Sequence, residues 1–154
     1  MAFSSREIEA PASAVFAVLA DPETYPDWLL GAANIREIDN NWPSPGSRFH
    51  HTVGVRPFAL MDHTEVRDVE PDRSLSLSVR ARPLVAAEVE FRIIGDGDRC
   101  VVTFEEEPTL RVIGNLARPL MDPMTHVRNH RSLRRLEQVV LRRRAGEGRE
   151  RSSV

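Results

Sequence analysis

Residues 74–94 read SLSLSVRARPLVAAEVEFRII. Apolar and polar residues alternate on both sides of Arg82-Pro83, which is the pattern of two half-buried β-strands joined by a turn. A connection this short can join only antiparallel neighbours, because a parallel crossover needs a dozen or more residues. This stretch therefore predicts one hairpin of an antiparallel sheet.

The same pattern covers the middle of the chain, where no helical period persists and turn residues separate short alternating runs. These runs follow one another so closely that each pair should form a hairpin. We therefore expect a seven-stranded antiparallel meander. The predicted strands are residues 2–9, 35–40, 47–55, 58–69, 74–81, 86–94 and 100–106.

Helices are predicted at both ends of the sheet. Pro11 suits the first turn of a helix over residues 12–20, and Asp21-Pro22 is the N-cap and N1 signature of a second short helix. Asp122-Pro123 repeats that signature and predicts a long helix reaching Arg144, about 33 Å at 1.5 Å per residue. The fold class is therefore α+β: a curved antiparallel sheet grips a long C-terminal helix and leaves an internal, mostly apolar cavity.

Composition favours one ordinary globular domain. The chain has 154 residues, of which 41% are hydrophobic and 29% charged, and no apolar run approaches the roughly 20 residues that span a bilayer. A lone Cys100 excludes an internal disulfide, and the first residues lack the pattern of a secretory signal. We therefore expect a cytoplasmic protein.

Charge is distributed unevenly along the chain. All 21 basic residues are arginine, and from Arg118 onward ten arginines face four acidic residues. We expect one domain over residues 1–144, followed by a disordered basic tail over residues 145–154. No aromatic residue follows Phe104, so a base-stacking platform is missing and nucleic acid is not expected. Docking of the basic end on an acidic surface and a homodimer are left open.

Several stretches carry a resemblance to a known family. Residues 10–23 and Tyr25-Pro26-Asp27-Trp28, in this order of elements, resemble the START-like helix-grip (SRPBCC) superfamily, which includes polyketide cyclases and dehydrases, pollen-allergen-type proteins and lipid-transfer domains. Residues 42–47 and 128–136 resemble a bacterial branch of it. The resemblance, which spans about Ile8 to Leu141, implies the fold. It does not decide between carrier, receptor and enzyme.

Strand alternation selects polar residues that should face the cavity. His51 and Asp62 each share a face with the apolar residues of their strand, so both should point inward. If the loop between them is only Arg56-Pro57, His51 lies directly opposite Asp62; a four-residue loop would instead put Leu60 opposite His51. Glu106 should also project inward, where it must find a partner, hold a water or carry a proton.

The remaining candidates follow from the same faces and from the resemblance, which alone suggests His130 and Asn129. Trp28 either gates the cavity mouth or fastens the two short helices to the sheet. We expect the ligand to contact Trp28, Phe49, His51, Leu60, Asp62, Thr64, Leu77, Val79, Phe91, Phe104, Glu106, Val127 and His130.

Three functions remain for these polar groups. His51 with Asp62 or Glu106 could be the acid and base of a cyclase or dehydratase. They could also orient a ligand without chemistry, or His51 and Asp62 could satisfy one another and fix the hairpin register.

An alternative metal site would use Asp122, His126 and His130, which are spaced four apart on one helical face. This spacing alone is a weak motif, so no metal is expected. No motif for a nucleotide, covalent nucleophile or other cofactor occurs, and none is expected. We favour binding of a small hydrophobic molecule such as a polyketide, a lipid or a related metabolite.

Overall fold

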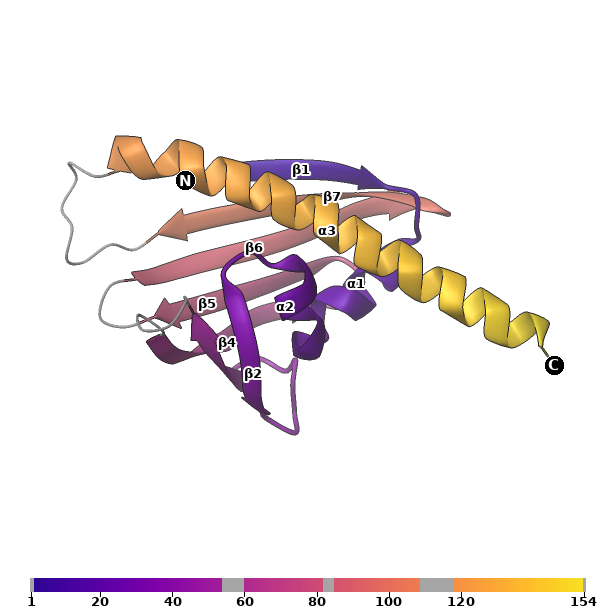
Figure 1. Cartoon of the computed structure of the whole chain (residues 1–154), viewed down its shortest axis with the longest axis horizontal. Helices are drawn as coiled ribbons and strands as arrows, with labels where there is room; N and C mark the ends of the chain where they lie inside the picture. Colours follow the sequence, from indigo (N-terminus) through magenta and orange to yellow (C-terminus); the bar gives the residue numbers. More distant parts are fainter. Residues whose placement is uncertain (1, 54–59, 82–84, 109–117, 154) are drawn as a thin grey trace.

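The computed structural model describes residues 2–53, 60–81, 85–108 and 118–153. Within these ranges seven strands form one antiparallel sheet in the order β1-β7-β6-β5-β4-β3-β2, so the predicted meander is confirmed, with β1 added beside β7 (Figure 1). The elements are β1 (Ala2–Ile8), α1 (Ala12–Leu19), the 3-10 turn η1 (Pro22–Thr24), α2 (Tyr25–Trp28), β2 (Ala32–Ile38), β3 (Arg48–Val53), β4 (Leu60–Glu70), β5 (Ser74–Ala81), β6 (Val85–Asp96), β7 (Arg99–Pro108) and α3 (Arg118–Ser152).

The helices share one side of the sheet. α3 runs obliquely across that side, and α1 and α2 lie beside its middle (Figure 1). The alternating residues of the strands face these helices, and Leu75, Leu77, Phe91 and Phe104 are buried there as predicted. This arrangement confirms the helix-grip fold and sets the inward face on which the candidate site lies.

α3 differs from the prediction at both of its ends. It begins at Arg118 and not at Asp122, because Pro119 already occupies the first turn, where its missing N–H costs nothing, and Pro123 falls inside the helix. It also continues to Ser152, so the predicted disordered tail is wrong. Alanine, arginine and glutamate favour helix strongly enough there to outweigh two glycines.

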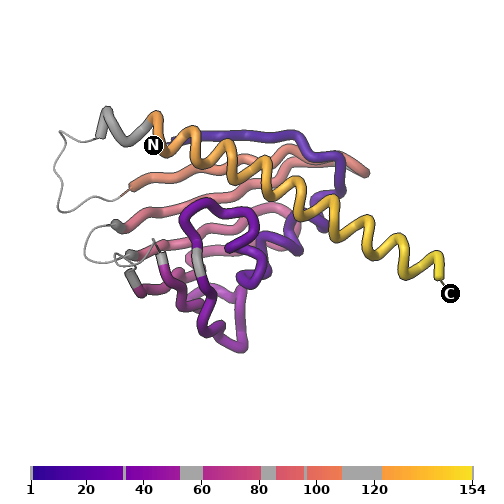
Figure 2. The backbone as a smooth tube through the Cα atoms, in the orientation of Figure 1, coloured from indigo at the N-terminus to yellow at the C-terminus, as the bar shows by residue number. Residues whose placement is uncertain are grey.

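The last turns of α3 project beyond the sheet (Figure 2). Residues 141–153 are all exposed, which fits their charged composition. Among the helices in the described ranges, none combines the length and the apolar character that crossing a membrane requires.

The hairpin joining β6 and β7 depends on a glycine in close contact with the opposite strand. A Cβ atom on Gly95 would lie 2.4 Å from the Cβ of Cys100 and 2.6 Å from the carbonyl oxygen of Arg99. Because backbone and a buried side chain cannot both move away, we expect Gly95→Ala to lower the free energy of unfolding by about 2 kcal/mol, measured by urea denaturation.

Gly97 provides the matched control in the same hairpin. It has a positive φ of 67° and open space around its Cβ direction. Asparagine tolerates this conformation, so Gly97→Asn should change the free energy of unfolding by less than about 1 kcal/mol. Equal losses in the two variants would contradict the steric explanation.

Candidate functional site

The pairing of β3 with β4 decides between the two predicted registers. His51 lies opposite Asp62, and Val53 lies opposite Leu60. This is the register expected from a two-residue loop, and it excludes the pairing of Leu60 with His51. The loop itself, residues 54–59, lies outside the described residues.

His51 is buried on the inward face, with 4% of its surface exposed. Its Nε2 lies 2.9 Å from Oγ1 of Thr64, and its ring centroid lies 5.5 Å from that of Phe49. Burial lowers the pKa of His51 to about 4 and outweighs the opposing effect of the Asp62 carboxylate. The imidazole is therefore neutral at pH 7.

Asp62 makes its described contacts with the next residue. Its Oδ1 accepts a hydrogen bond from the backbone N–H of His63 at 2.9 Å and lies 3.0 Å from Nδ1 of the His63 ring. Burial lowers the pKa of His63, although Asp62 opposes this. Sequence reasoning missed His63, because alternation assigns it to the opposite face from Asp62. Its position next to the acid is the only signal that could have identified it.

Glu106 is buried on β7 and has found a partner on α3. Its carboxylate forms an ion pair with Arg128, and the guanidinium also donates to Oδ1 of Asn129. Of the three alternatives predicted for Glu106, the structure shows the first, in which the carboxylate has a partner. The carboxylate is therefore held in place by a cation.

Trp28 is fully buried. Its Nε1 donates to Oγ1 of Thr24 at 3.1 Å, and its ring meets Tyr25 and Phe91 edge to face with centroids 4.9 Å and 5.7 Å apart. A gate residue would reach the surface. The contacts of Trp28 instead match the alternative in which it fastens the short helices to the sheet.

α3 presents a different face from the one expected. Val127 is 50% exposed and His130 is exposed, so both lie on the solvent side and do not line an interior. The buried side carries Asn129, Ser132 and Leu133. The rotation follows from packing, since Oγ of Ser132 accepts a hydrogen bond from the backbone N–H of Leu30 after α2.

The other predicted contact residues remain on the inward face where the structure describes them. Thr64 and Leu77 are buried and Val79 is half-buried, while the side chain of Leu60 lies outside the described residues. Phe49, Phe91 and Phe104 belong to the core.

The metal alternative gains no support. His126 and His130 are exposed, and Nδ1 of His126 lies 3.5 Å from Oγ of Ser4. The side chain of Asp122 lies outside the described residues, and no group of three metal-binding side chains occurs among those that are described.

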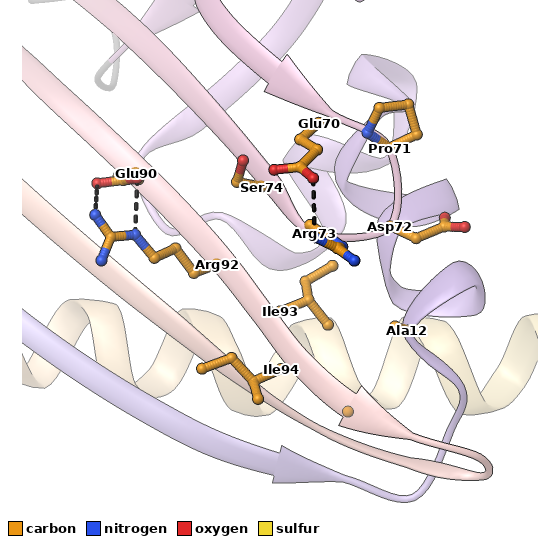
Figure 3. Close-up of a pocket in the computed structure, with 11 residues that line it drawn as sticks. Ala12, Glu70, Pro71, Asp72, Arg73, Ser74, Glu90, Arg92, Ile93 and Ile94 are labelled. Carbon is orange, nitrogen blue, oxygen red and sulfur yellow. Dashed lines mark hydrogen bonds and ion pairs between the residues drawn. The ribbon is translucent and has the colours of Figure 1, made fainter.

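Two surface hollows lie apart from His51 and Asp62. The larger, about 730 Å³, lies beside the β4–β5 turn, β6 and the start of α1, where Glu70 pairs with Arg73 and Glu90 with Arg92 (Figure 3). The smaller, about 180 Å³, is lined by Ser76, Val89 and glutamates of β6 and β7, among them Glu106. Neither contains His51, so an internal cavity beside it stays a prediction.

The chain is similar to proteins of a known family. A family model described as polyketide cyclase / dehydrase and lipid transport matches residues 3–141. A comparison with curated proteins gives no match.

Several solved structures are similar to the chain. The Zhui aromatase/cyclase from Streptomyces sp. R1128 has 19% identity and a TM-score of 0.72, covering 92% of this chain and 93% of its own. A START superfamily protein from Mycobacterium smegmatis has 18% identity and a TM-score of 0.68, covering 91% and 96%. The di-domain ARO/CYC StfQ from the steffimycin biosynthetic pathway has 12% identity and a TM-score of 0.71, covering 94% and 51%. At these identities the likeness shows the fold alone.

Proposed function

We propose, because this chain belongs to the polyketide cyclase / dehydrase and lipid transport family, that it binds a small hydrophobic molecule between the sheet and α3. A polyketide, a lipid or a related metabolite fits this description. The observation that carries the proposal is the buried His51, which lies with Thr64 on a mostly apolar inward face.

The inward face has the composition of a small-molecule site. Phe49, Leu77 and Phe91 make this face mostly apolar. His51 and Thr64 add a few polar atoms that would fix the orientation of a ligand.

A cyclase or dehydratase is the second candidate, and His51 with Asp62 would be its acid–base pair. A neutral imidazole can accept a proton from the carbon beside a carbonyl group, and the opposed Asp62 would stabilise the imidazolium that forms. Glu106 is a weaker candidate for this role, since Arg128 already neutralises its carboxylate.

The His51→Ala variant distinguishes ligand binding alone from catalysis. For His51→Ala we expect binding of the neutral apolar dye N-phenyl-1-naphthylamine to change by only a few-fold, because most of the contact surface is retained. If the protein is an enzyme, turnover of an accepted polyketide should fall at least about 100-fold. Native mass spectrometry of freshly purified protein, which detects a co-purified molecule, would supply the candidate substrate.

Ile94→Ala is the control, because this side chain is 70% exposed and should affect neither measurement. Failure of the wild-type protein to bind the dye or to retain any small molecule would count against both candidates. Unchanged turnover in His51→Ala would remove the enzyme and leave the carrier.

A further inference from the structure

His50 and His63 form a pair of imidazoles on the outer side of the sheet. They are register partners on β3 and β4, and their ring centroids lie 5.9 Å apart with an angle of 55° between the ring planes. The adjacent residues His51 and Asp62 face inward, so alternation turns both histidines away from the helices, which lie on the inward side (Figure 1). Two side chains that can bind a metal therefore share one position on the solvent side of the sheet.

A dissolved ion can reach this pair. Both residues are partly exposed, and the side chain of His63 is 12% exposed. His51, in contrast, is buried on the opposite face of the same sheet. The pair is therefore open to solutes without any movement of the core.

Asp62 fixes the tautomer of the His63 ring. Its Oδ1 lies 3.0 Å from Nδ1 of that ring and, as a carboxylate oxygen, can only accept a hydrogen bond. In the neutral imidazole the proton is therefore on Nδ1, and Nε2 carries the lone pair. Histidines that bind metals generally donate their other ring N–H to a carboxylate or carbonyl group, which orients the ring and makes it a stronger ligand.

The charge state of His63 also suits a metal ligand. Burial lowers its pKa, the positive charges of Arg48 and Arg80 act in the same direction, and Asp62 opposes them. The ring is therefore neutral at pH 7 and has no proton that a metal would have to displace from Nε2.

Carboxylates offset the repulsion that these arginines would exert on a cation. Arg48 forms an ion pair with Glu65 at 2.7 Å, and Glu37 lies opposite His50 in the pairing of β2 with β3. Together with Asp62 they place negative charge around the two imidazoles.

The separation of the two rings fits a single bridging ion. Bonds from zinc to histidine nitrogen are about 2.0–2.1 Å long, so two imidazoles on one ion have centroids roughly 5 to 6.5 Å apart. The observed separation lies in this range. No group of three metal-binding side chains occurs in the part of the chain that the structure describes, so water would complete the coordination.

α3 carries a second pair of histidines with which this one can be compared. His126 and His130 lie one helical turn apart, and both are exposed. Nδ1 of His126 lies 3.5 Å from the hydroxyl of Ser4, and among the described side chains no carboxylate bonds either ring. The pair on β3 and β4 is therefore the better oriented of the two.

We propose that Nε2 of His63 and a ring nitrogen of His50 bind a divalent transition-metal ion, such as Zn²⁺, on the outer side of the sheet, and that Asp62 orients His63 for this role. Imidazole is a preferred ligand of zinc, copper and nickel. The ion would link β3 to β4. This inference does not rest on the proposed function, because it concerns the opposite face of the sheet.

The test uses the double variant His126→Gln/His130→Gln as its reference protein, so that the helical pair cannot contribute. Isothermal titration calorimetry with Zn²⁺ alone at neutral pH should show one ion bound per chain. Adding His50→Gln or His63→Gln removes one ligand of the pair and should lower the affinity at least about tenfold. Adding Asp62→Asn should lower it about tenfold, the usual effect of losing a partner that orients a ligand.

Met61→Gln is the matched control. Met61 is 69% exposed and lies two residues before His63 on the outer face of β4, so this change should leave the affinity for Zn²⁺ within a few-fold. Electron paramagnetic resonance of the reference protein with Cu²⁺ identifies the ligands without any change in the strands. Its spectrum should show coupling to two nitrogen atoms.

Two results would overturn the inference. One is a reference protein that takes up no Zn²⁺; the other is an affinity that stays the same in His50→Gln and His63→Gln. In either case the contact between the two rings is packing only. An unchanged affinity in Asp62→Asn would contradict the orienting role of Asp62.

Discussion

Trp28→Ala should lower the free energy of unfolding by about 4 kcal/mol. The wild-type side chain is fully buried, so its removal leaves a cavity between α2 and the sheet. The edge-to-face contacts with Tyr25 and Phe91 are lost as well. So is the hydrogen bond that the indole N–H of Trp28 donates to Oγ1 of Thr24. The midpoint of urea denaturation, followed by circular dichroism, measures this change.

Two control variants identify the source of the loss. Trp28→Phe keeps an aromatic ring but not the indole N–H, and we expect it to lose about half as much stability. Met124→Ala removes a side chain that is 74% exposed and should change the free energy of unfolding by less than about 0.5 kcal/mol. A Trp28→Ala protein with normal stability and faster entry of an apolar dye would instead support the gate role.

The sheet could be predicted because its determinants are local. Alternation in residues 74–81 and 86–94 fixes which side chains face inward, and short turns force antiparallel pairing. The opposition of His51 and Asp62 followed from counting back along two strands from one assumed turn. The structure confirms that register, so even a long-range contact was within reach of sequence reasoning.

The start and the buried face of α3 could not be predicted from local sequence patterns. Asp122-Pro123 carries a start signal, but α3 begins earlier, at Arg118, and Pro123 lies inside it. The buried face of the helix is set by tertiary contacts such as that of Ser132 with Leu30, which no single-sequence pattern reveals. This is why Val127 and His130 were expected inside although both are exposed.

The sequence predicts which strand residues face inward at the site, but not the contacts that their side chains make. Alternation places His51, Asp62 and Thr64 on one face, and all three are buried there. It cannot show that Asp62 bonds the backbone and ring of the adjacent His63, because it assigns neighbouring residues to opposite faces. Nor can it show which helical residue meets Glu106, since that depends on the position of α3 along the sheet.

Acidification should destabilise the protein through His51. Its pKa is about 4 in the folded state and about 6.5 when exposed. Between these values the unfolded chain binds a proton that the folded protein does not, so the free energy of unfolding falls as the pH falls from 6.5 to 4. The loss should level off below pH 4, where both states bind the proton. We expect His51 to contribute about 2 to 3 kcal/mol over this interval.

His51→Gln isolates this contribution, because an amide at this position can still bond Thr64 but cannot titrate. Urea denaturation at a series of pH values should show a steeper loss for the wild-type protein than for His51→Gln between pH 6.5 and 4. His63, whose pKa is also lowered, adds a loss of the same sign to both proteins and so largely cancels in the difference. Parallel curves for the two proteins would mean that His51 takes up its proton in the folded state near pH 6.5, which is incompatible with a desolvated imidazole on the inward face.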